Sequence, residues 1–314
     1  MQLEMSRDLR IADFQQLLGD TLPDGCHQAI AQNVFKYRPL HGTDREDVFL
    51  RVLKALDSPL ESAGRHRHHR WESGWTENLE DFIASEYDVR ALVPKFVKRG
   101  EVIRFRGEYV LPTNPYFETS FVTVLRRFLF QKWFANVEHI FEFGCGTAHN
   151  LVEAANMFPD KALHGLDWTE SSLKIISLLK QQLDIRIDSA MFDMLKPDAG
   201  QRLPSSSGVL TIGALEQLGT QFEPFLEYLV AQAPEVCVHV ETLYEEYSQN
   251  DLFDYVAARY IEKRGYLRGF LPALRNLESA GDIKIEAVKR TFGSLYHDGY
   301  SFLVWRPATV RSTT

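Results

Sequence analysis

The second half of the chain alternates short apolar runs with longer helical patterns. The runs at residues 139–143, 161–167 and 185–190 are too short for typical helices, and each is followed by a turn or a polar segment. Helical spacing of apolar positions fills the stretches between them. Strands that alternate with helices in this way predict a parallel sheet with helices packed on its faces.

Two more apolar runs, at residues 208–212 and 236–241, add strands to this sheet. By the right-handed crossover rule, the strand at 208–212 lies beside the one at 139–143, across the point where the strand order reverses. The runs at 283–292 and 300–305 flank a turn and predict an antiparallel pair. The expected fold class is therefore α/β, with a Rossmann-like sheet of seven strands, mostly parallel, that ends in a C-terminal antiparallel hairpin.

The first part of the chain has a different pattern. Helical periodicity recurs at residues 1–20, 27–36, 43–56 and 79–93. Thr43 and Glu46 have the spacing of a capping box at the start of the third helix, and two short runs around Arg106-Gly107 predict a small hairpin. We expect a mostly helical domain with one hairpin, residues 1–112, ahead of the sheet domain, residues 113–314.

An irregular segment, residues 58–76, interrupts these helices. Arginines and histidines fill the stretch from Arg65 to Arg70, and Trp71 and Trp75 follow. The segment is expected to be a solvated linker or a lid whose tryptophans stack on a sugar-like or acidic acceptor. A metal site is the weakest alternative, because adjacent histidines on a loop lack the paired spacing of zinc ligands.

The strand at 139–143 runs directly into a glycine turn and a helix at 148–158. Gly144 and Gly146 lack a Cβ atom, so the backbone can turn sharply and a ligand can approach it closely. The free N–H groups of the helix and its positive dipole end favour an anionic group there. His149 stands where a dinucleotide-binding turn needs a third small residue, which disfavours a pyrophosphate. A nucleotide-type ligand is expected at this turn.

Carboxylates follow the next two strands. Asp167 ends the strand at 161–167 and can accept both hydroxyls of a ribose. Asp193 follows the third strand and offers a second carboxylate beside the same crevice. With these residues in place, the segments Glu142 to Thr147, Asp167-Trp168 and Asp193-Met194 resemble the successive motifs of the class I S-adenosylmethionine-dependent methyltransferases, over residues 116–306.

The resemblance implies a cofactor, S-adenosylmethionine, and a place for each of its parts. Gly144 and Gly146 would pack against the methionine part, and Asp167 would hold the ribose. Trp168 would flank the adenine, and Asp193 would accept a hydrogen bond from the adenine amino group. The resemblance also places Glu142 near the amino end of the cofactor and puts Cys145 and Met194 among the residues that contact it. Tyr116, at the start of the helix that precedes the first strand, is a further candidate for this contact.

Several side chains are candidates for catalysis. His239 and Glu241 lie two residues apart on one face of a strand, where the carboxylate would raise the basicity of the imidazole. The alternative for His239 is a hydrogen-bonded core histidine. Glu216, after the strand at 208–212, is a candidate for contacting substrate or cofactor, or else caps a short turn. His297, in the turn of the final hairpin, is a second candidate base.

These residues predict a methyltransferase that acts on a hydroxyl of a small-molecule or saccharide acceptor. His239 or His297 would be the base, with Glu216 or Glu241 orienting it, and no metal is required because the methyl donor is already activated. Residues 242–280, rich in tyrosine and arginine, are expected to form the other wall of the substrate pocket. The alternatives are N-methylation of an amine or a protein side chain, aminopropyl transfer, and a non-catalytic module that only binds the cofactor.

Composition narrows the partners. The net charge of −8 makes nucleic acid an unfavoured partner, because binding a phosphate backbone depends on clustered lysine and arginine. The three cysteines, at positions 26, 145 and 237, suggest neither a disulfide framework nor a zinc module and fit a reducing compartment. The chain has no long apolar run and no leader-like start, so we expect a cytoplasmic protein without membrane insertion.

Overall fold

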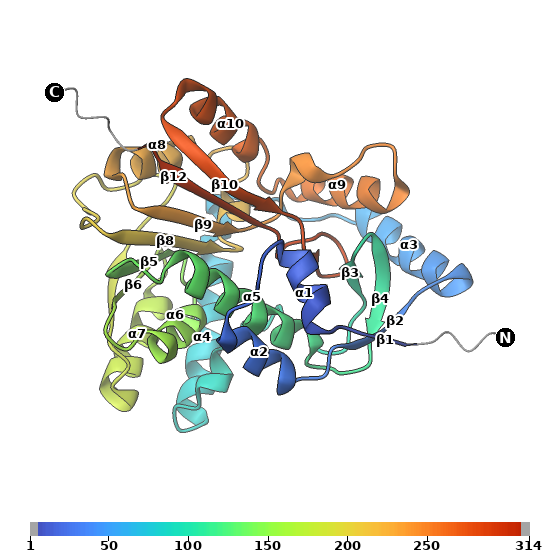
Figure 1. Cartoon of the computed structure of the whole chain (residues 1–314), viewed down its shortest axis with the longest axis horizontal. Coiled ribbons are helices and arrows are strands. Elements are labelled where there is room, and N and C mark those ends of the chain that lie inside the picture. The colour runs from blue at the N-terminus through green and yellow to red at the C-terminus, as the bar shows by residue number, and fades with distance from the viewer. Residues whose placement is uncertain (1–5, 309–314) are drawn as a thin grey trace.

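The computed structural model describes residues 6–308 and is built around a seven-stranded sheet (Figure 1). The strand order is β10-β12-β9-β8-β5-β6-β7. The parallel strands are β5 (His139–Phe143), β6 (Ala162–Asp167), β7 (Ile187–Met191), β8 (Ser207–Ile212) and β9 (Val236–Val240). The antiparallel strands are β10 (Ile283–Lys289) and β12 (Phe302–Pro307). The predicted fold class is confirmed, including the antiparallel pair at one edge.

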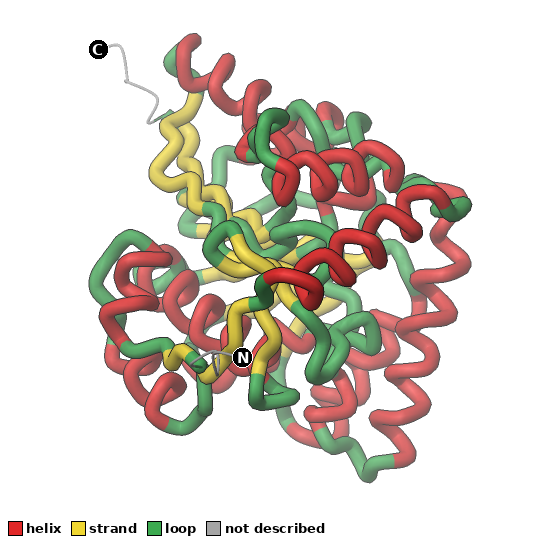
Figure 2. Tube along the Cα trace, turned by 90° about the vertical axis from the view of Figure 1, so that its right-hand side faces the viewer, coloured by secondary structure: helices red, strands yellow, loops and turns green. Residues whose placement is uncertain are grey.

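Helices cover both faces of this sheet, and the turned view in Figure 2 shows the strands passing between them. The first face packs against α5 (Phe117–Trp133), α6 (His149–Met157) and α7 (Glu170–Leu183), and the second against α8 (Glu223–Gln232) and α10 (Phe270–Ala280). Alternate residues of β5 serve the two cores, Ile140 the first and Phe141 and Phe143 the second. Because both faces are covered, β9 is buried along its whole length.

The N-terminal part combines four helices with a second sheet. The helices are α1 (Ile11–Leu18), α2 (Asp24–Ala31), α3 (Gly42–Asp57) and α4 (His68–Ala84). The sheet has the order β1-β2-β4-β3-β11, with β1 (Arg7–Asp8), β2 (Lys36–Pro39), β3 (Ile103–Phe105), β4 (Glu108–Pro112) and β11 (Phe292–Gly293). The predicted hairpin is its β3–β4 pair. The strand β11 comes from the end of the chain, so the sheet joins the two parts; the division at residue 112 stays a prediction.

Four local predictions are corrected. The helix expected at 79–93 ends at Ala84, and a separate 3-10 helix, η2 (Val89–Leu92), follows it. The segment expected to be irregular contains a 3-10 helix, η1 (Arg65–Arg67), and then α4, whose stripe of Trp71, Trp75 and buried Phe82 packs inward. The capping box is not formed: α3 starts after His41 with no side-chain cap. The helix expected at 27–36 ends at Ala31, and residues 32–35 lead from it into β2. Polar positions within α4 interrupt the apolar spacing, which hides the helix from a periodicity test.

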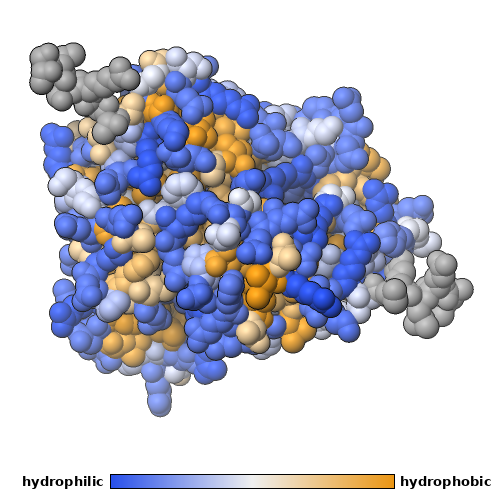
Figure 3. Space-filling view, in the orientation of Figure 1, coloured by the Kyte–Doolittle hydropathy of each residue, from blue (hydrophilic) through white to orange (hydrophobic). Residues whose placement is uncertain are grey.

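The face of the molecule drawn in Figure 3 is mostly polar. Hydrophilic residues cover most of the face in Figure 3, and apolar residues show between them. Of the helices within residues 6–308, none combines the length and the apolarity that a membrane crossing requires.

Candidate functional site

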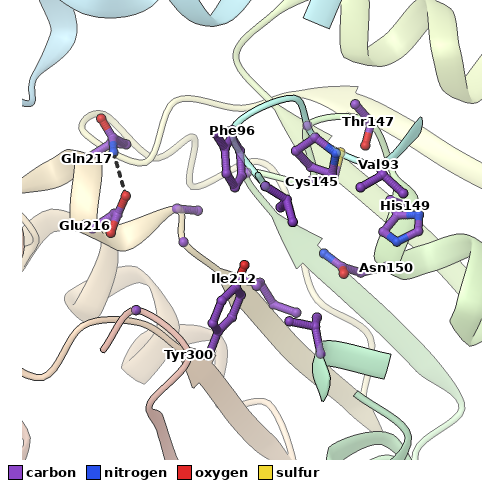
Figure 4. A pocket seen from close by; sticks show the side chains of 18 of the residues that line it. Val93, Phe96, Cys145, Thr147, His149, Asn150, Ile212, Glu216, Gln217 and Tyr300 are labelled. Atoms are coloured by element: carbon purple, nitrogen blue, oxygen red, sulfur yellow. Dashed lines mark hydrogen bonds between the residues drawn. The ribbon is translucent and has the colours of Figure 1, made fainter. Parts of the chain in front are cut away.

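A cavity of about 800 Å³ opens at the carboxyl ends of the parallel strands. Its position beside β5 and β8, where the strand order reverses, is the usual ligand site of an open α/β sheet. In Figure 4, Cys145 and His149 lie on one side of the cavity and Glu216 and Gln217 on the opposite side. We call the first side the glycine-turn end, with Gly144, Gly146, Asp167, Trp168 and Asp193, and the second the arginine end, with Arg67, Glu216, Arg264, Tyr266 and His297.

The glycine turn leaves no room for side chains. Gly144 and Gly146 have φ angles of +69° and +52°, in the left-handed region that glycine adopts most easily. A Cβ atom on Gly144 would lie 2.5 Å from the Cβ of Ala214, and one on Gly146 would lie 2.8 Å from the ring of Trp75. The neighbour that approaches Gly146 is therefore a tryptophan of α4, which covers the turn.

Asp167 holds the glycine turn in place. Its Oδ2 atom accepts the N–H of Gly146 at 2.8 Å, and its Oδ1 atom accepts the hydroxyl of Thr169 at 2.7 Å. Burial raises the pKa of the Asp167 carboxyl, and these hydrogen bonds oppose that shift. The carboxylate also lines the cavity, and it has lone pairs left for a ligand.

The arginine- and histidine-rich stretch at residues 65–70 contacts Trp168 and Asp193 of the glycine-turn end. Asp193 pairs with Arg65, with 2.8 Å between Oδ2 and Nη1, and the ring of Trp168 lies edge-on to His68 at 5.2 Å. The carboxylate of Glu72 accepts two backbone N–H groups at the start of α7, an arrangement that stabilises a helix N-terminus. These contacts dock α4 over the cavity as one of its walls. Within the described residues, no group of three potential ligands is arranged to hold a metal ion.

Glu142 lies behind the cavity wall and does not line it. Its Oε1 atom accepts from Asn150 at 2.7 Å, and burial raises the pKa of the carboxyl to about 8. Asn150 in turn accepts from Arg126 at 3.0 Å. Arg126, only 4 % exposed, lines the cavity and has no carboxylate partner among the described residues. The residue at the cavity surface is therefore Arg126, which the sequence patterns did not single out.

The remaining residues expected at the cofactor also border the cavity. Cys145 is buried, and burial raises the pKa of its thiol well above the usual range. The side chain of Met194 lies beside Gly144, with 3.4 Å between its Cε atom and the place of a Cβ. Tyr116 is 49 % exposed at the rim, where its hydroxyl accepts from Arg99 at 3.3 Å.

His239 is a core histidine, which corrects the expectation that it is a base. Its Nδ1 atom lies 2.9 Å from the hydroxyl of Thr211, and its Nε2 atom accepts the indole N–H of Trp305 at 3.0 Å. Burial lowers the pKa of the imidazole to about 3. His239 is fully buried and does not line the cavity, so it has no route to an acceptor.

Glu241 also has a structural place rather than a catalytic one. Its carboxylate accepts the backbone N–H groups of Ala214, Leu215 and Glu216, at 3.0 to 3.2 Å. It therefore holds the 3-10 helix η3 (Leu215–Leu218) that follows β8. Burial raises the pKa of Glu241 to about 7, and the three N–H groups oppose the shift.

Glu216 points into the cavity from η3. Its Oε1 atom accepts from Gln217 at 3.0 Å (Figure 4), and Gln217 in turn accepts from Arg67 at 2.7 Å. Burial, with a smaller contribution from the charge of Glu241, raises the pKa of Glu216 to about 8. The capping alternative is excluded, because Glu241 is the residue that caps this turn.

His297 lines the cavity between two tyrosines. Its ring is stacked on Tyr260 with centroids 5.8 Å apart and lies edge-on to Tyr266 at 5.5 Å. Burial lowers the pKa of the imidazole to about 4, and its Nδ1 atom has no hydrogen-bond partner within the described chain. The next residue, Asp298, accepts from Arg104 at 3.1 Å and from Arg290 at 2.6 Å, which fixes the turn.

Residues 242–280 form part of the cavity wall, because α9 (Leu252–Arg264) and the loop after it supply Tyr260, Arg264 and Tyr266 to it. That a substrate binds against this wall stays a prediction. Sequence patterns did not single out Arg67 or Arg264. The signal for Arg67 is the basic stretch from Arg65 to Arg70, and for Arg264 it is an arginine three positions after the buried Ile261 in α9.

No protein-family model matches the chain, and no curated protein matches it. Solved structures similar to it include "PigF with SAH", at 14 % identity and a TM-score of 0.46, covering 84 % of this chain and 70 % of that one. Human N-acetylserotonin methyltransferase in complex with SAM has 12 % identity and a TM-score of 0.44, covering 83 % and 67 %. A SAM dependent methyltransferase from Aquifex aeolicus has 14 % identity and a TM-score of 0.40, covering 57 % and 87 %. The sheet topology described above agrees with the Rossmann-like fold that the resemblance in the sequence implies.

Proposed function

We propose that the chain is an S-adenosylmethionine-dependent methyltransferase that methylates a hydroxyl of a small-molecule or saccharide acceptor. One observation carries the proposal: a single cavity joins the glycine turn and Asp167 at one end to Glu216 and His297 at the other. Its volume, about 800 Å³, lies in the upper part of the usual range for ligand pockets, so a nucleoside cofactor and a small acceptor fit together.

The residues at the glycine-turn end suit this cofactor. The turn of Gly144 and Gly146 would border the methionine part, and Asp167 would accept from the ribose. Trp168 and Asp193 would border the adenine. Arg126, buried without an ionic partner and with an unpaired Nε atom, would bind the carboxylate of the methionine part.

The cofactor supplies a methyl group that is already activated on a sulfonium, so the protein needs to align the acceptor, exclude water and remove a proton. His297 is suited to the last task by its position rather than by its basicity, because burial lowers the pKa of its imidazole to about 4. Its low pKa keeps the imidazole neutral at pH 7, and its unpaired Nδ1 atom can accept the proton of the hydroxyl as the oxygen attacks. Glu216, protonated below about pH 8, can donate a hydrogen bond that orients the acceptor.

N-methylation of an amine or a protein side chain is the second candidate. The rings of Tyr260 and Tyr266 beside Glu216 could hold an ammonium group by cation–π interactions. An amine acceptor needs less help from a base, so methylation of an amine that survives replacement of His297 would favour this candidate.

Two measurements test the proposal. Calorimetry with S-adenosylhomocysteine should show binding to the wild-type protein, and the absence of binding would refute the cofactor. A screen of cell extract with a labelled methyl donor, followed by mass identification of the product, should yield a labelled small molecule. Cofactor binding without any labelled product would instead support a module that only binds the cofactor.

We also propose a cytoplasmic location. The three cysteines are all buried and free, which suits a reducing compartment.

A further inference from the structure

We propose that Arg67 and Arg264 form a binding subsite for a carboxylate of the acceptor, which would make the acceptor a hydroxylated acid with a flat, apolar body. The inference rests on the proposed function for the identity of the reaction, but the subsite itself can be tested without it.

Arg264 is a buried cation without an anion. It is 9 % exposed, lines the cavity, and has no carboxylate within 4.0 Å among the described residues. Its one side-chain hydrogen bond goes from Nη2 to the hydroxyl of Tyr266 at 3.1 Å, and its Nε atom is buried without a partner. A guanidinium has five N–H donors, and burying its charge unpaired is costly. The charge and the free Nε donor of Arg264 are therefore suited to bind an anionic group in the cavity.

Arg67 stands at the same end and is also incompletely paired. It is 8 % exposed, and its Nη1 atom donates to Gln217 at 2.7 Å. Its Nε atom lies 3.5 Å from Glu61, but Glu61 lies closer to the exposed Arg70, at 3.0 Å. Burial and the positive charge of Arg264 both lower the pKa of Arg67, so the two guanidinium groups repel each other across the site.

The carboxyl groups around Arg67 and Arg264 do not neutralise both positive charges. Glu61 is shared between Arg67 and Arg70, and Glu216 is mostly protonated at pH 7 because its pKa is raised to about 8. A net positive charge remains between Arg67 and Arg264. Guanidinium groups bind planar oxyanions through paired N–H donors, which matches a carboxylate.

The wall next to the pair is aromatic. Tyr260 is stacked on Tyr296 with centroids 4.5 Å apart and an interplanar angle of 7°, and Tyr266 lies edge-on to His297. All four line the cavity. A flat body held against these rings, with its acid group on the arginines, would place a hydroxyl near the unpaired Nδ1 atom of His297.

The first experiment compares two probes that differ in charge alone. Binding of benzoate and of benzamide to the wild-type protein is measured by calorimetry or ligand-observed NMR, with and without S-adenosylhomocysteine. We expect benzoate to bind about tenfold more tightly or better, the effect of charge-assisted hydrogen bonds. Equal affinities would overturn the proposal. Phenyl phosphate is the third probe, and a preference for it over benzoate would overturn the assignment to a carboxylate.

The second experiment places the preference on the two arginines. Arg264→Gln and Arg67→Gln should each reduce the benzoate preference by about tenfold while the affinity for S-adenosylhomocysteine stays within about twofold. Arg259→Gln, on the same helix but exposed and outside the cavity, is the matched control and should keep the preference. If either cavity variant loses affinity for S-adenosylhomocysteine instead, its guanidinium belongs to the cofactor site and the proposal is wrong.

The outcomes also separate the two proposals. A benzoate preference in a protein that does not bind S-adenosylhomocysteine would refute the methyltransferase and leave the anion subsite standing. Binding of S-adenosylhomocysteine without a benzoate preference would do the reverse.

Discussion

The two ends of the cavity differ in how completely their polar atoms are paired. At the glycine-turn end, Asp167 accepts hydrogen bonds from Gly146 and Thr169, so the turn is held by the protein itself. At the arginine end, Arg264 and His297 each keep a buried nitrogen without a partner. At the first end the turn itself is held by the protein and, among the described residues, only Arg126 beside it keeps an unpaired Nε atom, whereas at the second end the groups that would face an acceptor are themselves unpaired.

The ends also differ in where their residues come from. The glycine-turn end is contributed by the three successive connections that follow β5, β6 and β7, within residues 144–193. The arginine end is collected from η1, η3, α9 and the turn between β11 and β12. A ligand common to many proteins can be served by local motifs, but an acceptor specific to this chain needs residues brought together by the tertiary fold.

The largest expected effect is at the glycine-turn end. Gly146→Arg should abolish measurable binding of S-adenosylhomocysteine in calorimetry, because the position has a positive φ angle and no space beside Trp75. Gly74→Arg is the matched control: Gly74 lies in α4, nothing surrounds the place of its Cβ, and binding should persist. A Gly146→Arg protein that binds like the parent would move the cofactor away from this turn.

The next largest effect is at the arginine end. His297→Ala should lower the rate of methyl transfer to a hydroxyl acceptor by about 10²-fold or more, since general bases contribute factors of this size. The affinity for S-adenosylhomocysteine should not change, because His297 lies at the opposite end from the glycine turn. A rate that stays at the wild-type level would remove His297 from the mechanism.

The contrast between the two histidines gives a stability prediction. His239→Ala should destabilise the fold by about 2–4 kcal/mol, because it opens a cavity and leaves the indole N–H of Trp305 unpaired. The affinity for S-adenosylhomocysteine should be kept. Thermal unfolding followed by circular dichroism measures the first effect, and His297→Ala, which removes no side-chain hydrogen bond within the described residues, serves as the comparison. Loss of turnover in a folded His239→Ala protein would contradict the core assignment.

The smallest effect depends on pH and comes from Glu216. A carboxyl whose pKa is raised on folding to about 8 loses stability as the pH rises through that value, because the buried form must then ionise. Glu216→Gln removes this loss, so the Tm of the variant should match the parent near about pH 5 and exceed it by a few degrees near about pH 9. Measuring the difference in Tm cancels the contribution of Glu142, which titrates in both proteins. A difference that is independent of pH would show that Glu216 ionises normally.

Local patterns were sufficient for the sheet and the glycine turn. Each parallel strand is a short apolar run, and the residue that matters at its end, such as Gly144 or Asp167, is adjacent in sequence. The same reasoning gave the right face for His239 but the wrong role. Strand alternation says which side a residue faces, whereas the partners Thr211 and Trp305 come from neighbouring strands.

The parts that were missed depend on distant segments. The helix α4 is held against the sheet domain by two contacts: its Glu72 accepts backbone N–H groups at the start of α7, and its Trp75 packs against Gly146. No pattern within residues 58–76 reveals these contacts. The strand β11 has two residues and exists only because β3 pairs with it. Arg67 and Arg264 are far apart in the chain, so their joint charge is visible only in three dimensions.

The pairing of β11 with β3 has a consequence for engineering. The turn that carries His297 begins just after β11, and Arg104 of β3 reaches Asp298 and the backbone carbonyl of Phe253. The turn that carries His297 is thus held in place by the β3–β4 hairpin, which precedes the glycine turn in the chain. A chimera that joins only residues 113–308 to the N-terminal part of another protein would lose this support for the His297 turn.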